Sequence, residues 1–208
     1  MQNIILVGGG GHCKSVIDIA EEAGYNIIGI IDVKENVGKS ILGYSVIGTD
    51  DNIADWINSA FFIVTVGQIK NNSIRQHLYQ KIISAGGKLI TIIAQDSHVS
   101  KHASIKEGSV IMHKAVVNAN STIGIGCIIN TFANIEHDTS IGDFCHISTG
   151  AMVNGNCEIL NSTFIGSGAI ISNGVSIAAN TIIAAGSVVR KTIFESGIYA
   201  GNPAIKYK

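Results

Sequence analysis

Two short segments of the chain hold residues able to do chemistry. In the first, Glu136-His137-Asp138, an imidazole stands between two carboxylates, which suits a general base whose ring an acidic neighbour orients. In the second, four glycines from Gly8 to Gly11 precede His12, and glycines let a backbone approach a phosphate closely. Each has a plainer interpretation, because a surface histidine is often only solvated and a glycine run is often only a tight turn.

The glycine run lies where a predicted strand meets a predicted helix. The expected elements are strands at 3–7, 25–31 and 61–66 and helices at 13–23 and 71–85. The second helix is amphipathic, with Ile74, Leu78 and Ile82 on one face. This alternation predicts a small Rossmann-like parallel α/β sheet as the first domain, residues 1–92.

Parallel sheets bind ligands at the carboxyl ends of their strands, where Asp32 and Gly67 also fall. Asp32 follows Gly8 by 24 residues, a distance suited to contacting a ribose or a base. A dinucleotide fingerprint requires a third glycine, and this chain has Cys13 there. The sequence therefore favours a nucleotide or nucleotide-sugar over NAD.

A six-residue repeat determines the second domain, residues 93–208. From Ile93 to Val189 an isoleucine or valine occurs at every sixth position, seventeen times without insertion. A period of six fits neither an α-helix nor a flat strand, and it is the hexapeptide signature of a parallel β-helix. Three hexads make a coil of 18 residues, so residues 18 apart are expected to stack at about 4.8 Å.

The composition agrees with this fold and limits the partners. Isoleucine occurs 39 times and leucine 5 times, which favours strands over helices. A net charge of −1 argues against nucleic-acid binding, and four cysteines do not suggest a disulfide scaffold. The N-terminus shows no leader-like segment and no apolar run is long enough to cross a membrane, so we expect a cytoplasmic protein.

One long stretch carries no basic residue. Between Lys114 and Arg190 there is neither lysine nor arginine, although the chain has 14 of them. A polar, uncharged surface would explain this, but interface cores also exclude charge, and a three-sided prism closes naturally into a ring of three. We therefore predict a homotrimer.

The glycine run followed by the solenoid resembles the bacterial nucleotide-sugar N-acetyltransferases of the bacillosamine-pathway type and the related sialic acid O-acetyltransferases. The most specific match is the run 130–147, and residues 200–204 resemble the closing segment of hexapeptide acyltransferases. The resemblance implies a left-handed β-helix that transfers acetyl from acetyl-CoA to a nucleotide-linked amino sugar. The implied acceptor is a 4-amino-4,6-dideoxyhexose on UDP or dTDP, used in surface-glycan biosynthesis.

The resemblance also implies roles for individual residues. His137 matches the general base and Asp138 the acidic neighbour that raises its basicity. The acetyl-CoA-binding positions are His146, Gly155, Ser167 and Ala185, with the Gly155 N–H facing the reacting carbonyl. The nucleotide-sugar-binding positions are Gly10, Gly11, His12, Asp32 and Gly67. The family has an aspartate pair where this chain has Asp32-Val33, which leaves open which nucleobase the nucleotide carries.

Two consequences follow for the assembly. His137 and His146 are half a coil apart, so they are expected on different faces and can share a site only across a subunit interface. Basic residues occur again at the end of the chain: Arg190, Lys191, Lys206 and Lys208. They would suit the 3′-phosphate of CoA, although a solvated tail explains these charges equally well.

Other functions are compatible with parts of the pattern. The first alternative is an O-acetyltransferase acting on sialic acid or another free sugar. A non-catalytic scaffold or sugar-nucleotide sensor is less consistent with the intact His137-Asp138 pair. β-Helical carbonic anhydrases have a histidine pair five residues apart on the solenoid, which this chain lacks, so no metal is expected.

Overall fold

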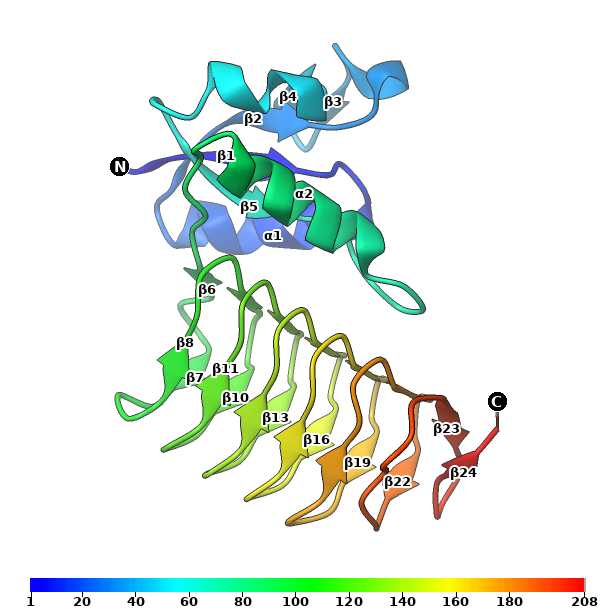
Figure 1. Ribbon diagram of the computed structural model, residues 1–208. Helices are drawn as coiled ribbons and strands as arrows, with labels where there is room; N and C mark the ends of the chain where they lie inside the picture. The colour runs from blue at the N-terminus through cyan, green and yellow to red at the C-terminus, as the bar shows by residue number, and fades with distance from the viewer. Residues whose placement is uncertain (208) are drawn as a thin grey trace. The chain divides into compact units, whose positions relative to one another are not determined.

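The computed structural model describes residues 1–207, and it contains two compact units that divide between Gln95 and Asp96 (Figure 1). The sequence predicted a division between residues 92 and 93. The first unit is an α/β domain and the second a stack of β-coils, so the predicted fold class is confirmed. In the described residues, no helix is both long and apolar enough to span a bilayer.

The α/β unit is built on a sheet with the strand order β3-β4-β2-β1-β5. The strands are β1 (Asn3–Val7), β2 (Asn26–Ile31), β3 (Ser40–Ile41), β4 (Tyr44–Gly48) and β5 (Phe61–Val64), followed by β6 (Ile92–Ile93) at the end of the unit. The helices are α1 (Gly11–Glu22) and α2 (Ser73–Ser84), with 3-10 turns η1 (Lys34–Asn36) and η2 (Asp50–Asp55). All pairings are parallel except that of β3 with β4.

The predicted strands and helices are present, with ends that move by up to two residues. The β3–β4 hairpin was not predicted, because its two strands are short and lack a clean apolar alternation. One residue of α2 departs from the predicted face: Ile74 is 63% exposed, whereas Arg75 is 2% exposed. The physical reason is that the Arg75 guanidinium donates to backbone carbonyls at the end of β5.

The second unit repeats a two-residue strand every six residues and stacks these strands into three parallel faces. The first face contains β7 (His98–Val99), β10 (Val116–Val117), β13 (Asn134–Ile135), β16 (Met152–Val153), β19 (Ile170–Ile171) and β22 (Val188–Val189). The second face contains β8 (Ser104–Ile105), β11 (Thr122–Ile123), β14 (Ser140–Ile141), β17 (Glu158–Ile159) and β20 (Ser176–Ile177). The third face begins with β6 and continues with β9 (Val110–Ile111), β12 (Ile128–Ile129), β15 (His146–Ile147), β18 (Phe164–Ile165), β21 (Ile182–Ile183) and β23 (Ile198–Ala200). It ends with β24 (Ile205–Lys206), which pairs antiparallel with β23.

The register confirms the 18-residue coil, since Val117 pairs with Ile135 and Ile135 with Val153. From Ile111 to Val189 every sixth residue is at most 2% exposed and fills the interior. The earliest members of the repeat are less covered: Ile93 is 38% exposed, and Val99 and Ile105 are half-buried. The first coil has a stacked neighbour on one side only, so its interior positions are partly open.

The corners between the faces follow a second period of six that the sequence analysis did not find. Every sixth residue from Gly108 to Gly186 has a left-handed backbone conformation. Glycine, asparagine and aspartate tolerate this conformation best. Most corner positions meet that requirement, and Asn120, Asp138, Asn156 and Asn180 are the asparagines and aspartate among them.

Candidate active site

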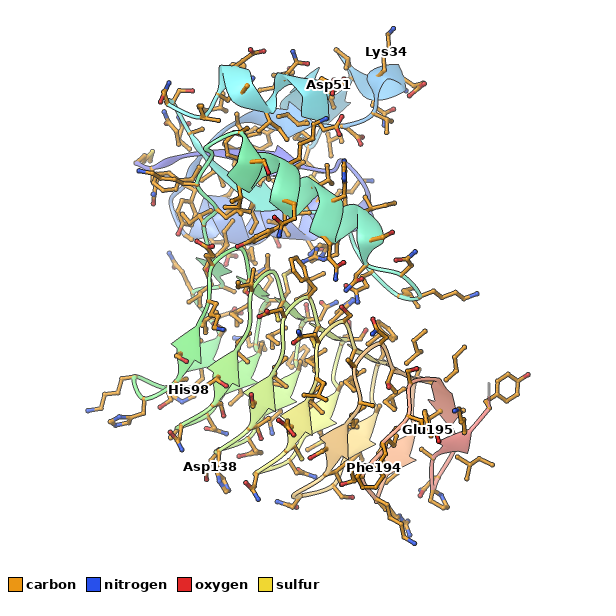
Figure 2. All side chains as sticks on the ribbon, viewed as in Figure 1. Lys34, Asp51, His98, Asp138, Phe194 and Glu195 are labelled. Carbon is orange, nitrogen blue, oxygen red and sulfur yellow. The ribbon has the colours of Figure 1, made fainter. Side chains whose placement is uncertain are left out.

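His137 and Asp138 lie side by side at the corner that follows β13 (Figure 2 labels Asp138). Nδ1 of His137 is 2.7 Å from Oδ2 of Asp138, and the other carboxylate oxygen, Oδ1, accepts a 2.7 Å hydrogen bond from Nδ2 of Asn120. The Asn120 amide, and then His137, hold the pKa of Asp138 below its usual value. An ionised carboxylate can only accept, so Nδ1 carries the proton and Nε2 is left as the basic nitrogen.

Glu136, the other carboxylate next to His137, is held elsewhere. Its two oxygens accept hydrogen bonds of 2.9 Å from the side-chain amides of Asn118 and Asn134. The sequence alone left either carboxylate as the partner of His137, and the structure assigns that role to Asp138.

The His137 ring lies over Gly155, one coil further along. A β-carbon at residue 155 would stand 2.8 Å from Cε1 and 2.9 Å from Nε2 of the ring, which is closer than real contacts allow. The side chain of His137 is 60% exposed, so a substrate can reach the ring. Glycine at 155, 18 residues after His137, therefore leaves a shallow notch beneath the ring.

The remaining acetyl-CoA-binding positions lie on another part of the coil. His146 projects from β15 on the third face, where its Nε2 is 3.1 Å from Nδ2 of Asn130 and its ring meets Phe164 edge-on at 5.1 Å. The side-chain oxygen Oδ1 of Asn130 already accepts from the Thr131 N–H, so the side-chain Nδ2 of Asn130 donates to His146 Nε2. His146 is thus fixed as the tautomer that carries its proton on Nδ1.

Ser167 and Ala185 occupy the corner between the third and first faces. The hydroxyl of Ser167 is 2.9 Å from the hydroxyl of Ser148, which follows His146 by two residues. The backbone carbonyl of Ser167 accepts a hydrogen bond from the Gly186 N–H. Ser167 and Ala185 are 18 residues apart and stack. Within one chain, the structure thus brings Gly155 to His137 and places Ser167 and Ala185 at a different corner.

The α/β unit has a cavity of about 400 Å³ at the carboxyl ends of β1, β2 and β5. Asp32, Val66 and Ile74 line it, which explains the exposure of Ile74. The Asp32 carboxylate accepts a 2.7 Å hydrogen bond from Asn36, whose own carbonyl accepts from Lys39. A second cavity of about 350 Å³ lies beside Gly9, with Lys14, Asn36 and Lys39 on its wall.

The other predicted nucleotide-sugar positions surround the start of α1. Gly10 and Gly11 have open space where a side chain would stand, and Gly67 lies against His12. The N-cap residue of α1 is Gly10, so no side chain at that position accepts a hydrogen bond from the first N–H groups of the helix. Cys13, which replaces the third glycine of a dinucleotide fingerprint, is a core residue, and burial raises the pKa of its thiol to about 11.

Sequence reasoning missed the residues that hold the glycine loop. Gly8 has φ +111° and packs against Val66, and the buried hydroxyl of Thr65 donates to the Gly8 carbonyl at 2.6 Å. Arg75 in turn donates to the Val66 carbonyl at 2.5 Å. No sequence signal identifies this arrangement, because the sequence predicts Thr65 to be an ordinary strand residue and Arg75 to be a charged residue on the surface.

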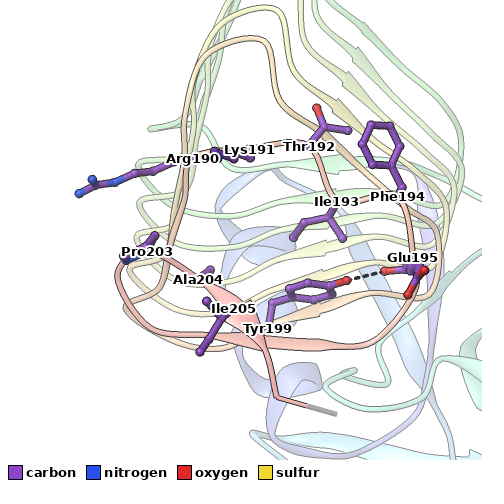
Figure 3. A pocket seen from close by; sticks show the side chains of 10 residues that line it. All are labelled: Arg190, Lys191, Thr192, Ile193, Phe194, Glu195, Tyr199, Pro203, Ala204 and Ile205. Carbon is purple, nitrogen blue, oxygen red and sulfur yellow. Dashed lines mark hydrogen bonds between the residues drawn. The ribbon is translucent and has the colours of Figure 1, made fainter.

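A cavity of about 640 Å³ lies at the C-terminal end of the coils (Figure 3). Arg190 and Lys191 line it together with Phe194 and Tyr199, and the Tyr199 hydroxyl donates to the Glu195 carbonyl. Lys206 pairs with the Glu195 carboxylate at 2.9 Å, and Lys208 lies outside the described residues. Across the described part of the chain, no three acidic, histidine or cysteine side chains are grouped as metal ligands.

Comparisons with known proteins give the family. The PglD N-terminal domain model matches residues 3–82, and the bacterial transferase hexapeptide model matches residues 156–191. Solved structures of acetyltransferases match nearly the whole chain. PerB from Caulobacter crescentus, solved with CoA and GDP-perosamine, is 30% identical over 100% of this chain and 98% of its own, with a TM-score of 0.93. The acetyltransferase domain of PglB from Neisseria gonorrhoeae FA1090, solved with acetyl coenzyme A, is 34% identical over 99% and 98%, with a TM-score of 0.90.

The chain belongs to the PglD-like family of acetyl-CoA-dependent sugar N-acetyltransferases. Membership confirms the predicted family, enzyme class and acyl donor. WeeI from Acinetobacter baumannii AYE, 23% identical over 99% of this chain and 100% of its own with a TM-score of 0.88, shares the fold. A search of curated proteins found no match.

Proposed function

We propose that this PglD-like enzyme acetylates the amino group of a nucleotide-linked amino sugar, with His137 as the general base. The observation that carries the proposal is the His137–Asp138 pair: an exposed imidazole, held on one nitrogen at 2.7 Å, whose other nitrogen lies over Gly155. A base fixed in this way suits proton removal from an attacking amine.

The steps follow from this geometry. The amine nitrogen attacks the thioester carbon while His137 Nε2 accepts an N–H proton, and a tetrahedral intermediate forms with its charge on oxygen. The backbone N–H of Gly155 is the proposed donor to that oxygen. Collapse breaks the C–S bond and leaves the amide, and the protonated ring returns its proton to the CoA thiolate.

His146, Ser167 and Ala185 are the proposed contacts of acetyl-CoA. The cavity with Arg190 and Lys191 would hold its adenosine 3′-phosphate, since both side chains are cations at the end of the same stack. The two corners that carry Gly155 and Ser167 are separate within one chain, which supports a site shared with a neighbouring subunit.

A homotrimer supplies that neighbour. Strand positions on the first face present partly exposed apolar side chains, namely Val116, Met152, Ile170 and Val188, and no lysine or arginine occurs from residue 115 to 189. Such a face needs cover in water. Sedimentation should give about three times the 21.8 kDa chain mass, and an active monomer would contradict both the trimer and the shared site.

The α/β unit is the proposed holder of the nucleotide, with Asp32 toward the ribose or base and Gly10, Gly11, His12 and Gly67 around the phosphates. The sequence favours UDP or dTDP and leaves GDP open, and PerB, the relative with GDP-perosamine bound, supports GDP as a candidate. The predicted sugar is a 4-amino-4,6-dideoxyhexose used in surface-glycan biosynthesis.

The test compares acceptors while thiol release from acetyl-CoA is followed. UDP-, dTDP- and GDP-linked 4-amino sugars are measured against the same sugar without a nucleotide and against free sialic acid. We expect one nucleotide-linked amine to react rapidly and the free sugar to react poorly, because the nucleotide anchors the amine at the base. Rapid acetylation of sialic acid with none of the amines would establish the O-acetyltransferase alternative instead.

A further inference from the structure

Asn120 stands one coil before Asp138 in the same corner column, and the two residues share a left-handed backbone conformation, with φ of 61° and 60°. Their side chains meet directly, because Nδ2 of Asn120 lies 2.7 Å from Oδ1 of Asp138. Neither the family resemblance nor the glycine-loop argument gives Asn120 a role.

We infer that Asn120 is a positioning residue for the reaction: its amide fixes the Asp138 carboxylate so that the other oxygen faces Nδ1 of His137. The inference rests on the proposed function, in which His137 is the base. It makes Asn120, Asp138 and His137 a linked set of amide, carboxylate and imidazole contributed by two successive coils.

The division of the carboxylate oxygens supports this role. Oδ1 accepts from the Asn120 amide and Oδ2 lies 2.7 Å from His137 Nδ1, so both oxygens of Asp138 are engaged by different groups. A carboxylate on an exposed corner would otherwise rotate about its terminal bond, since that torsion is broad. The amide removes this freedom and leaves one oxygen aligned with the ring.

A neighbouring amide shows how the corner separates its two carboxylates. Asn118 donates to Glu136 at 2.9 Å, also across 18 residues, and thereby holds Glu136 away from the ring. The two asparagines of one coil thus bind the two carboxylates of the next. One carboxylate is left to meet His137.

The test uses two replacements at residue 120 whose order of effect depends on the mechanism. Asn120→Gly removes the amide and keeps a residue that accepts a left-handed corner. Asn120→Asp keeps size and corner preference but sets a second carboxylate against Asp138, and two adjacent carboxylates do not both stay ionised. A positioning role predicts that kcat falls about three- to tenfold in Asn120→Gly and further in Asn120→Asp, with both KM values unchanged.

Asn180→Gly is the matched control. Asn180 has the same left-handed corner conformation, with φ of 57°, and lies at a corner away from His137. It should match the wild type in kcat, and its thermal midpoint gives the stability change that follows from replacing a corner asparagine by glycine. A purely structural role for Asn120 would reverse the order of the two variants, leaving Asn120→Asp near wild-type activity, and that result would overturn the inference.

His137→Ala separates this inference from the proposed function. If His137→Ala is inactive while both Asn120 variants retain wild-type kcat, the base stands and only the role of Asn120 is wrong. If His137→Ala retains activity, the proposed base is wrong whatever the Asn120 variants do.

Discussion

The α/β unit and the β-helix hold their functional groups by different means. In the α/β unit, two buried side chains fix the glycine loop by hydrogen bonds that follow no common spacing: Thr65 donates to Gly8 and Arg75 donates to Val66. In the β-helix, Asn120 meets Asp138 and Gly155 meets His137 because the coils repeat every 18 residues. Position in the second unit can therefore be found by counting residues, whereas position in the first depends on tertiary contacts.

The largest effect is expected at the centre of the β-helix site. His137→Ala should lower kcat by about 10²–10⁴, the usual contribution of a positioned general base. The side chain is exposed, so the thermal midpoint and acetyl-CoA affinity should not change. Steady-state kinetics with saturating substrates measures this, and a variant that retains more than about a tenth of the activity would exclude His137 as the base.

The next effect tests whether stacking alone shapes the site. Gly155→Ala places a β-carbon within 2.9 Å of two atoms of the His137 ring, so the ring must move and kcat should fall about 10- to 100-fold. Gly142→Ala is the control, since its β-carbon would stand 2.3 Å from Oδ1 of Asn161, away from His137. The control should lose stability in a thermal melt without a comparable loss of kcat, and equal losses of kcat would show that the effect is general.

Replacing one buried threonine in each unit allows a direct comparison of the effects on stability and on acceptor binding. Thr65→Val and Thr163→Val each remove one fully buried hydroxyl that donates to a carbonyl, at 2.6 Å to Gly8 and 3.2 Å to Ala178. Each should lower the free energy of unfolding by about 1 kcal/mol. Only Thr65→Val should also raise the KM of the nucleotide-linked acceptor, by a few-fold, because only it loosens a binding loop. Equal KM values for the two variants would remove Thr65 from the positioning of that loop.

The smallest effect concerns two phenylalanines in left-handed corners, Phe132 with φ 60° and Phe144 with φ 54°. Phe132 is 63% exposed, whereas the Phe144 ring packs against Gly126. Phe132→Asn should raise stability by about 0.5–1 kcal/mol because asparagine tolerates this conformation better. Phe144→Asn should gain less or lose stability, since it gives up that packing. Thermal melts of both variants measure the difference, and identical shifts would contradict it.

Much of the β-helix could be predicted because its period is strict and its core column holds only isoleucine and valine. The same 18-residue count explains why Gly155 lies beside His137. It did not reveal the left-handed corners, since phenylalanine, lysine and serine occupy some of them as well as glycine and asparagine. Nor did it decide between Glu136 and Asp138 as the partner of His137, because that choice depends on which amides each carboxylate meets.

The α/β unit was predictable in its main strands and helices and less so in what surrounds its pocket. Ile74 was expected to be buried because helical spacing puts it in line with Leu78 and Ile82, yet it lines a cavity. Arg75 was missed because a buried guanidinium is rare, and only the carbonyls at the end of β5 make its burial favourable. No local sequence pattern indicates the exposure of Ile74 or the burial of Arg75.

The 18-residue coil also governs which changes of length the enzyme can survive. One residue inserted between Asn120 and Asp138 would rotate every later position by one place, so that a different side chain would face the asparagine and apolar residues would leave the interior. Eighteen residues inserted after Val189 would instead add a whole turn, keep every earlier column in register, and lengthen the stack by about 4.8 Å. In this half of the protein, a small insertion is therefore more disruptive than a large one, and the solenoid can grow in evolution only by complete turns.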